Sequence, residues 1–205
     1  MDNFFATTTD DAAVQAGQLH SYLLPSLQTK TALAAYLAPL GQFDYLAPQP
    51  REALHLTVTR FKQASTDSLP AAIEQLTSAA EITALPALRG TWQAPICENS
   101  SVIMRCTLPG FAQLCEASER AAKRVLGADA VCYPRPYTSH LTLAYGVSSG
   151  PDEPVLESLE NVKAGLAEDV SADELFTSLA WCMVKQNPLA GTYTFQVLGV
   201  TEFAR

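Results

Sequence analysis

The sequence predicts an α+β fold in which most strands pair antiparallel. Stretches with helical apolar spacing and β-prone stretches follow one another irregularly along the 205 residues, without the steady strand–helix rhythm of a parallel sheet. Hydrophobic residues make up 48% of the chain and charged residues 17%, which supplies a packed core and excludes a disordered or fibrous chain. The length fits one domain, or two small lobes that share a core.

The chain shows a weak internal duplication. Each half has a helix, then a proline-containing segment, then a strand with His-Leu-Thr. In the first half, one helix ends at Gly41, a glycine stop signal, and the other has Pro70 in its first turn, where proline is tolerated. The elements expected in this half are a strand over 17–25, a helix over 26–41, a strand over 53–61 and a helix over 67–82.

The second half should begin with two strands joined by the turn sequence CENS and continue with the clearest helix of the chain, which ends at Gly127. A proline-rich segment, YPRPYT, precedes the strand with the second His-Leu-Thr. The chain closes with a hairpin around residues 188–191. The other elements expected here are strands over 87–95 and 100–108, helices over 110–127 and 152–168, and a strand over 139–145.

Residues 1–16 have neither the basic nor the apolar region of a signal peptide, so we expect a polar, disordered lead-in followed by a single domain over 17–205. No stretch approaches the length of a membrane span, and we expect no membrane partner. Five cysteines without a C-x-x-C pair indicate reduced thiols in a cytoplasmic protein. We expect a monomer that needs no cofactor.

The net charge of −8 and the pI of about 4.8 argue against binding long duplex nucleic acid, which requires clustered Lys and Arg. A nucleotide, or one short RNA end, can still bind in a local pocket.

Two of the three histidines, His55 and His140, are each followed by Leu-Thr inside an apolar, β-prone stretch. Side chains alternate along a strand, so each His shares one face with the Thr two residues later, Thr57 or Thr142, and the leucines point the other way into the core. Two imidazoles on one cleft suit acid–base chemistry near neutral pH, and a Thr hydroxyl can donate to a phosphate oxygen. This scheme uses no metal, and no carboxylate lies at ligand spacing to the two histidines.

The paired motifs His-Leu-Thr-Val at 55–58 and His-Leu-Thr-Leu at 140–143 resemble those of the 2H phosphoesterase superfamily, especially the bacterial 2′-5′ RNA ligase and RNA 2′,3′-cyclic phosphodiesterase group. The resemblance covers residues 17–203 through element order. It implies two pseudo-symmetric lobes of antiparallel sheet with outer helices around a central cleft. It also implies metal-independent hydrolysis of 2′,3′-cyclic phosphates of nucleotides or RNA ends, or 2′-5′ ligation, with His55 and His140 as the acid–base pair and the two threonines on the phosphate.

The chain departs from this pattern at one position. Many members of the bacterial group that it resembles carry an Arg three residues after the second Thr, where this chain has Tyr145, and Arg60 has the equivalent place in the first motif. Strict alternation puts Arg60 on the face opposite His55, which leaves Arg135 and Lys185 as other candidates for the phosphate contact. Tyr137 and Tyr145 flank the second motif and either stack on a base or pack in the fold. We expect the third histidine, His20, to be structural or exposed.

Two other classes of function compete with the phosphodiesterase. One is a non-catalytic module that binds a nucleotide or cyclic phosphate in the same cleft, although a pure binder has no need of two proton-transfer groups. The other is a hydrolase with a Cys or Ser nucleophile, although no cysteine lies in a motif that indicates activation.

Overall fold

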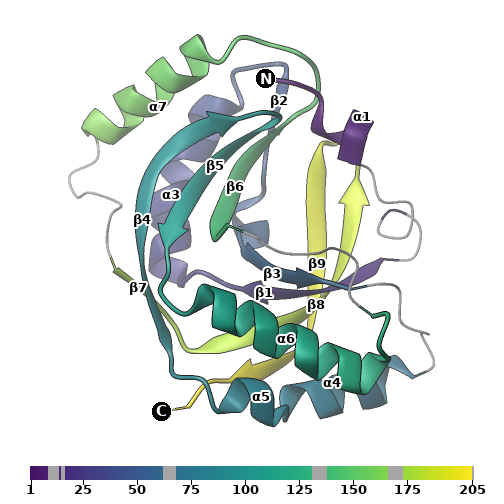
Figure 1. Ribbon diagram of the computed structural model, residues 1–205. Helices are drawn as coiled ribbons and strands as arrows, with labels where there is room; N and C mark the ends of the chain where they lie inside the picture. The colour runs from purple at the N-terminus through teal and green to yellow at the C-terminus, as the bar shows by residue number, and fades with distance from the viewer. Residues whose placement is uncertain (9–13, 15–16, 62–67, 131–137, 166–172, 205) are drawn as a thin grey trace.

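The computed structural model describes residues 1–8, 14, 17–61, 68–130, 138–165 and 173–204. Within these ranges nine strands form one sheet, and all neighbouring strands are antiparallel (Figure 1). The order is β7-β4-β5-β6-β3-β1-β8-β9, and the short β2 pairs with β6. The strands are β1 Gln18–Leu23, β2 Leu46–Pro48, β3 Leu56–Arg60, β4 Leu88–Glu98, β5 Ser101–Thr107, β6 His140–Gly146, β7 Asp173–Phe176, β8 Ser178–Asn187 and β9 Thr192–Glu202.

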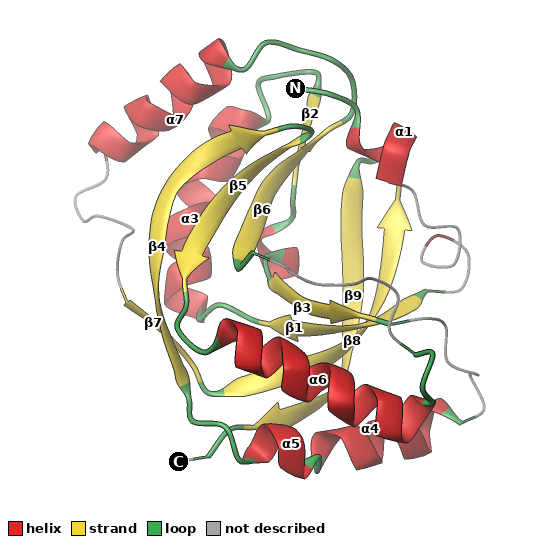
Figure 2. Ribbon diagram, viewed as in Figure 1, coloured by secondary structure: helices red, strands yellow, loops and turns green. Residues whose placement is uncertain are grey.

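The sheet consists of two four-stranded halves, β7-β4-β5-β6 and β3-β1-β8-β9, that meet at its centre. Among the described residues they are joined by the pair Leu56–Leu141, after which β3 and β6 diverge. The sheet therefore curls into a half-barrel instead of lying flat (Figure 2). The strand that carries a His-Leu-Thr motif is the innermost strand of each half. This arrangement confirms the α+β fold of two antiparallel lobes around a cleft.

Helices cover the sheet on the side away from the cleft. The long helix α3 follows β1 of one half but packs on β6 of the other, and α6 follows β5 but packs on β3. This exchange ties the two halves together. In Figure 2, α3 lies behind β4, β5 and β6, and α4, α5 and α6 lie beneath the other half. The helical elements are α1 Phe4–Thr8, α3 Leu27–Leu40, the 3-10 turn η1 Arg51–Ala53, α4 Leu69–Thr77, α5 Ala80–Thr83, α6 Phe111–Leu126 and α7 Glu153–Gly165.

The core lies between the sheet and these helices, and the motif strands contribute to it directly. Leu56 of β3 and Leu141 and Leu143 of β6 are fully buried. Each such leucine stabilises the fold by roughly 1.5–3 kcal/mol relative to an exposed one. Because side chains alternate along a strand, burial of the leucines turns the adjacent His and Thr side chains toward the cleft.

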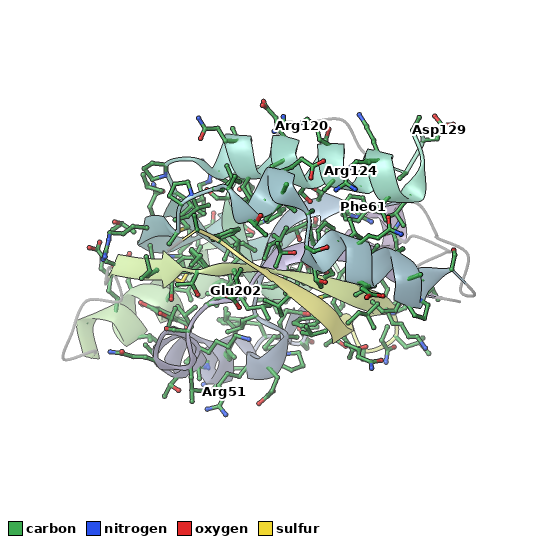
Figure 3. All side chains as sticks on the ribbon, turned by 90° about the horizontal axis from the view of Figure 1, so that it is seen from below. Arg51, Phe61, Arg120, Arg124, Asp129 and Glu202 are labelled. Carbon is green, nitrogen blue, oxygen red and sulfur yellow. The ribbon has the colours of Figure 1, made fainter. Side chains whose placement is uncertain are left out.

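Charged side chains gather on the outer surface of α6 (Figure 3). Arg124 donates two hydrogen bonds to Glu81 of α5, at 2.8 and 3.0 Å, and this fork joins the two helices. The guanidinium lowers the pKa of the Glu81 carboxyl to about 2, so the pair stays charged at neutral pH. This surface lies on the helix side of the sheet and is not part of the cleft.

Two element boundaries differ from the sequence prediction. The strand expected over 53–61 begins only at Leu56, after the η1 turn, so His55 lies just before β3. The helix expected over 67–82 is two helices, α4 and α5. Thr77 and Ser78 both donate side-chain hydrogen bonds to the Glu74 carbonyl, and Ala79 is extended, because Ser and Thr hydroxyls compete for helix carbonyls at such positions.

The disordered lead-in expected over residues 1–16 is wrong for its first part. Residues 1–8 are ordered, with α1 beginning after Asn3, whose Oδ1 accepts a hydrogen bond from the Ala6 N–H at 3.0 Å. The aromatic rings of Phe4 and Phe5 pack on the cleft side of the molecule, near Tyr145. Two adjacent Phe residues were the sequence signal that this segment is not a solvated tail.

Candidate active site

The two His-Leu-Thr motifs lie side by side because β3 and β6 are neighbours. They meet at the antiparallel pair Leu56–Leu141, the middle residue of each His-Leu-Thr. All four side chains line one cavity of about 160 Å³. The structure therefore brings together the four motif residues that the sequence singled out.

The two imidazoles are held in the same way. His55 Nδ1 lies 2.6 Å from the carbonyl oxygen of Ala53, and His140 Nδ1 lies 2.9 Å from that of Thr138, two residues back in each case. A carbonyl oxygen only accepts hydrogen bonds, so Nδ1 carries the hydrogen on each ring. In both histidines Nε2 is then the nitrogen that can take up or give away a proton at the cavity.

Arg60 and Tyr145 also line this cavity, contrary to strict alternation. Each motif strand has a β-bulge at the same place. Tyr22 pairs with Thr57 and Ser21 with Thr59, so Val58 is an extra residue in β3. Leu143 is the extra residue in β6, where Ile103 pairs with Thr142 and Val102 with Ala144.

A bulge shifts the side-chain phase by one residue. The residue three positions after each Thr therefore returns to the cavity face, which corrects the expectation that Arg60 faces away from His55. Arg60 also lies beside His20 in the register of β1 and β3.

His55 is in contact with aromatic rings. The ring of Tyr22 stacks on it with centroids 3.8 Å apart and an angle of 19°, and the Phe195 ring meets it edge-on at 5.6 Å. Burial lowers the pKa of His55 to about 4, outweighing the Ala53 hydrogen bond, which raises it; electrostatic interactions with Lys30 and His140 lower the pKa further. At neutral pH His55 is therefore a neutral imidazole with a lone pair on Nε2.

His20, which we expected from the sequence to be structural or exposed, lies behind the site. It is 2% exposed and lines the same cavity. Its Nε2 lies 2.7 Å from Gln18 Oε1, which can only accept, so Nε2–H donates there and Nδ1 accepts from the Tyr22 hydroxyl at 2.7 Å. Burial lowers the pKa of His20 well below its ordinary value, and the charge of Arg60 adds to this. The neutral His20 thus fixes the Tyr22 ring that stacks on His55.

Tyr145 belongs to an aromatic cluster at the other end of the cavity. Its ring lies 4.3 Å from that of Phe4 and 5.3 Å from that of Tyr193, by centroids. Burial raises its pKa well above the ordinary value, although a hydrogen bond with Thr142 works in the opposite direction. The hydroxyl therefore stays protonated.

The remaining sequence candidates fall elsewhere. Lys185 is exposed on β8 and does not line the cavity, and Tyr137 and Arg135 lie outside the described residues. Sequence reasoning missed five lining residues: Phe4, His20, Tyr22, Ser101 and Tyr193. For His20 and Tyr22 there was a signal, since Gln18, His20 and Tyr22 alternate as polar side chains along a strand, and for Phe4 the signal was its place beside a second phenylalanine.

The described cysteines lie away from the cavity. Burial raises the pKa of Cys106 and of Cys182 to about 12, which disfavours the thiolate that a cysteine nucleophile needs. Among the described residues no three His, Cys, Asp or Glu side chains are grouped so that they could hold a metal ion. No helix in the described part of the chain is long and apolar enough to cross a membrane.

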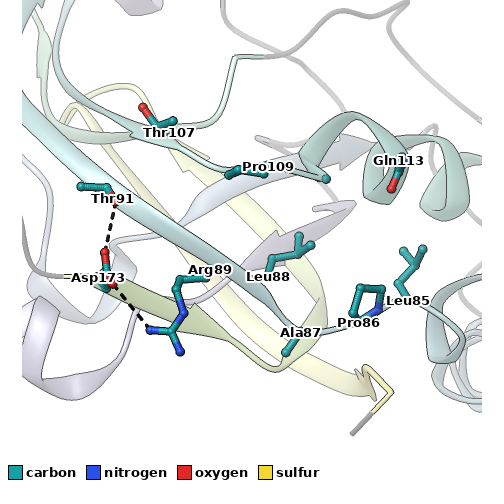
Figure 4. A pocket seen from close by; sticks show the side chains of 11 residues that line it. Leu85, Pro86, Ala87, Leu88, Arg89, Thr91, Thr107, Pro109, Gln113 and Asp173 are labelled. Carbon is teal, nitrogen blue, oxygen red and sulfur yellow. Dashed lines mark hydrogen bonds and ion pairs between the residues drawn. The ribbon is translucent and has the colours of Figure 1, made fainter.

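A second cavity, of about 480 Å³, lies between β4, β7 and the start of α6 (Figure 4). Arg89 and Thr91 both contact Asp173 at its edge, at 3.7 and 3.2 Å, and the rest of the lining is largely apolar. It is larger than the histidine cavity but its described lining contains no histidine and no buried charged group, so the groups that can exchange protons near neutral pH line the smaller cavity.

Known proteins match this chain in structure but not in sequence. No family model and no curated protein sequence matches the chain. Several solved structures do. The structure of TT0787 from Thermus thermophilus has a TM-score of 0.66 at 16% identity, covering 90% of this chain and 97% of that one. A structure described as a phosphoesterase has a TM-score of 0.65 at 15% identity, covering 92% and 99%.

Escherichia coli LigT complexed with 3′-AMP has a TM-score of 0.63 at 13% identity, covering 92% of this chain and 99% of that one. The chain has the fold of these three structures. This fold is the one that the resemblance to the 2H phosphoesterases predicts. At 13–16% identity, structural similarity supports the fold alone, and the activity has to be argued from the residues of the cavity.

Proposed function

We propose that this chain is a 2H-type phosphodiesterase that opens the 2′,3′-cyclic phosphate of a nucleotide or short RNA end. One observation carries the proposal: two imidazoles, each held through Nδ1 by the carbonyl two residues back, line one cavity, each with a Thr hydroxyl from its own strand. A fold that needed these histidines only for packing would not have to fix both tautomers and turn both rings to the same space.

The lowered pKa of His55 supports a role for this residue as the proton acceptor. His55 is neutral at physiological pH because of its lowered pKa, so its Nε2 can remove a proton from an attacking water. His140 is then the proton donor to the departing ribose oxygen. The bond between phosphorus and the water oxygen forms as the bond to one ribose oxygen breaks. The resemblance to the family points to the 2′-phosphate as product, in which case the P–O3′ bond breaks.

The other cavity residues suit the phosphate itself. Thr57 and Thr142 can each donate a hydroxyl hydrogen to a non-bridging oxygen, and the bulge in β3 brings the Arg60 guanidinium to the same face. This scheme assigns every proton transfer to a side chain. We therefore expect turnover without a metal ion.

A nucleotide is the substrate class that best fits the surroundings. The similar LigT structures were solved with 3′-AMP, ATP and NADP⁺, which supports nucleotide recognition on this fold. The net charge of −8 disfavours long RNA, because each phosphate contact draws on Lys or Arg.

The test is hydrolysis of the four nucleoside 2′,3′-cyclic monophosphates in the presence of EDTA, with the products assigned as 2′- or 3′-phosphates. Wild type should turn over, and His55→Ala and His140→Ala should each lose roughly 10²–10⁴-fold in kcat, the usual contribution of a general acid or base. Lys185→Ala, on the exposed side of β8, is the matched control and should match wild type. Tight binding without turnover would instead favour the binding module.

A further inference from the structure

The segment Met1–Thr8 lies against β6, one of the two motif strands, and contributes Phe4 to the lining of the histidine cavity. In Figure 1 the segment runs from the N-terminus to α1. The Asp2 N–H donates to the Asn99 carbonyl at 3.1 Å, and the Asn3 side-chain amide donates to the Val147 carbonyl at 2.7 Å. The segment lies so close to the end of β6 that a Cβ at Gly146 would collide with the Asp2 carbonyl oxygen. It is therefore part of the wall of the site.

The two phenylalanines of the segment have different surroundings. Phe5 is 7% exposed and packs in the aromatic and aliphatic cluster around Tyr193, where it anchors the segment. Phe4 is half-buried and lines the cavity that holds both motif histidines. Its ring covers that of Tyr145, which stands where relatives have an arginine. Phe4 thus places an apolar ring at the end of the cavity.

The cavity is small for a nucleotide. Its volume of about 160 Å³ is below the roughly 300–1,000 Å³ typical of small-molecule pockets. The cyclic phosphate and its ribose would therefore fill the interior, and whatever is attached to them has to extend past the lining residues, of which Phe4 is one. Residues 1–8 contain no Lys or Arg side chain that could contact the phosphates of a longer chain.

We propose that Phe4 is a specificity-determining residue whose ring closes this end of the cavity and selects a cyclic mononucleotide over RNA with a cyclic end. This inference rests on the proposed function, because it names the length of the substrate at the same site. It assigns no role in bond breaking to Phe4. Its effect falls on the preference between two substrates that undergo the same reaction.

The experiment compares kcat/KM for adenosine 2′,3′-cyclic monophosphate and for triadenylate with a 2′,3′-cyclic end. Wild type should prefer the mononucleotide. Phe4→Ala should shift the ratio toward the trinucleotide by roughly tenfold or more, the scale on which pocket shape discriminates. Phe4→Tyr, which keeps the ring, should retain the wild-type ratio. Phe43→Ala is the matched control: it removes a half-buried ring that does not line the cavity and should leave the ratio unchanged.

An unchanged ratio in Phe4→Ala, or an equal shift in Phe43→Ala, overturns the proposal. A parallel binding measurement separates it from the proposed chemistry, with 3′-AMP and 3′-phosphorylated triadenylate as probes. If no variant turns over either substrate but Phe4→Ala gains affinity for the trinucleotide alone, the selectivity stands and the hydrolysis fails. If no variant binds either probe, both proposals fail.

Discussion

Leu56 and Leu141 face each other across the centre of the sheet, and this one pair sets the geometry of the candidate site. Both side chains are fully buried on the helix side. Their burial turns His55 and His140, one residue before each leucine, toward the same cavity. The two halves of the chain contribute equivalent groups because the leucines occupy equivalent places in them.

The pH dependence follows from the surroundings of His55. The proposed base must be deprotonated, and burial lowers its pKa to about 4. We expect kcat/KM to fall on the acid side with a midpoint near pH 4, and to be fully present above it. A pH–rate profile on a cyclic mononucleotide checks this, because kcat/KM reports the free enzyme. A midpoint near the ordinary value of 6.5 would contradict the assignment of His55 as a buried base.

The same pKa contributes to stability, with a sign fixed by its direction. The folded-state pKa of His55 is below the unfolded value, so the unfolded chain binds the proton more readily. This single group should lower the free energy of unfolding as the pH falls below 6.5, until the decrease levels off below about pH 4. Urea denaturation of wild type and His55→Asn between about pH 7 and pH 4.5 measures it. The variant should show a shallower decrease, and an equal decrease in both would exclude His55 as the source.

Tyr22 should act as a positioning residue for His55. Its ring stacks on the imidazole and its hydroxyl is fixed by His20. Tyr22→Leu removes the ring and admits water, so kcat should fall roughly 10²-fold from misplacement of the base, and the acid midpoint should move upward from about pH 4. Tyr22→Phe keeps the stacking ring and is the conservative comparison, with the acid midpoint close to that of wild type. Thermal denaturation of both variants identifies simple unfolding, which would reduce kcat without moving the midpoint.

Arg60 should act on substrate affinity. Charge-assisted hydrogen bonds contribute about 1.5–3 kcal/mol, so Arg60→Gln should lower the affinity for inorganic phosphate or 3′-AMP by roughly 10–100-fold. Arg60→Lys retains the charge and should recover part of the lost affinity, although a lysine cannot reproduce the bidentate geometry. Titration calorimetry measures the affinity of both variants. Equal affinity in Arg60→Gln and wild type would place Arg60 in a structural role only.

The central part of this site could be predicted from the sequence because it depends on local alternation. His55, Thr57, His140 and Thr142 reach the cavity through the period of two that the motifs display. Arg60 and Tyr145 could not be placed in this way. The bulges at Val58 and Leu143 depend on pairing with β1 and β5, and a single strand does not reveal its partner's register.

The wall residues are the part that sequence reasoning missed, and the reason is distance along the chain. Phe4 meets Tyr145 only because the fold brings the first residues to the end of β6. Most of residues 1–16 are small or polar, so their composition suggested a polar lead-in. The two adjacent phenylalanines had more influence on the structure of this segment than its average composition.

Gly146 provides an independent way to move the wall. A Cβ there would collide with the Asp2 carbonyl oxygen and lie 3.0 Å from Met1 Cγ. Gly146→Ala should therefore displace the segment Met1–Thr8 without altering any residue that lines the cavity. It should shift the substrate ratio toward the trinucleotide, as Phe4→Ala does, and the double variant should shift it no further, because both act on the same ring. Faster proteolytic cleavage near residue 8 would show the displacement directly. An intact segment with a shifted ratio, or a displaced segment with the wild-type ratio, would contradict the role assigned to Phe4.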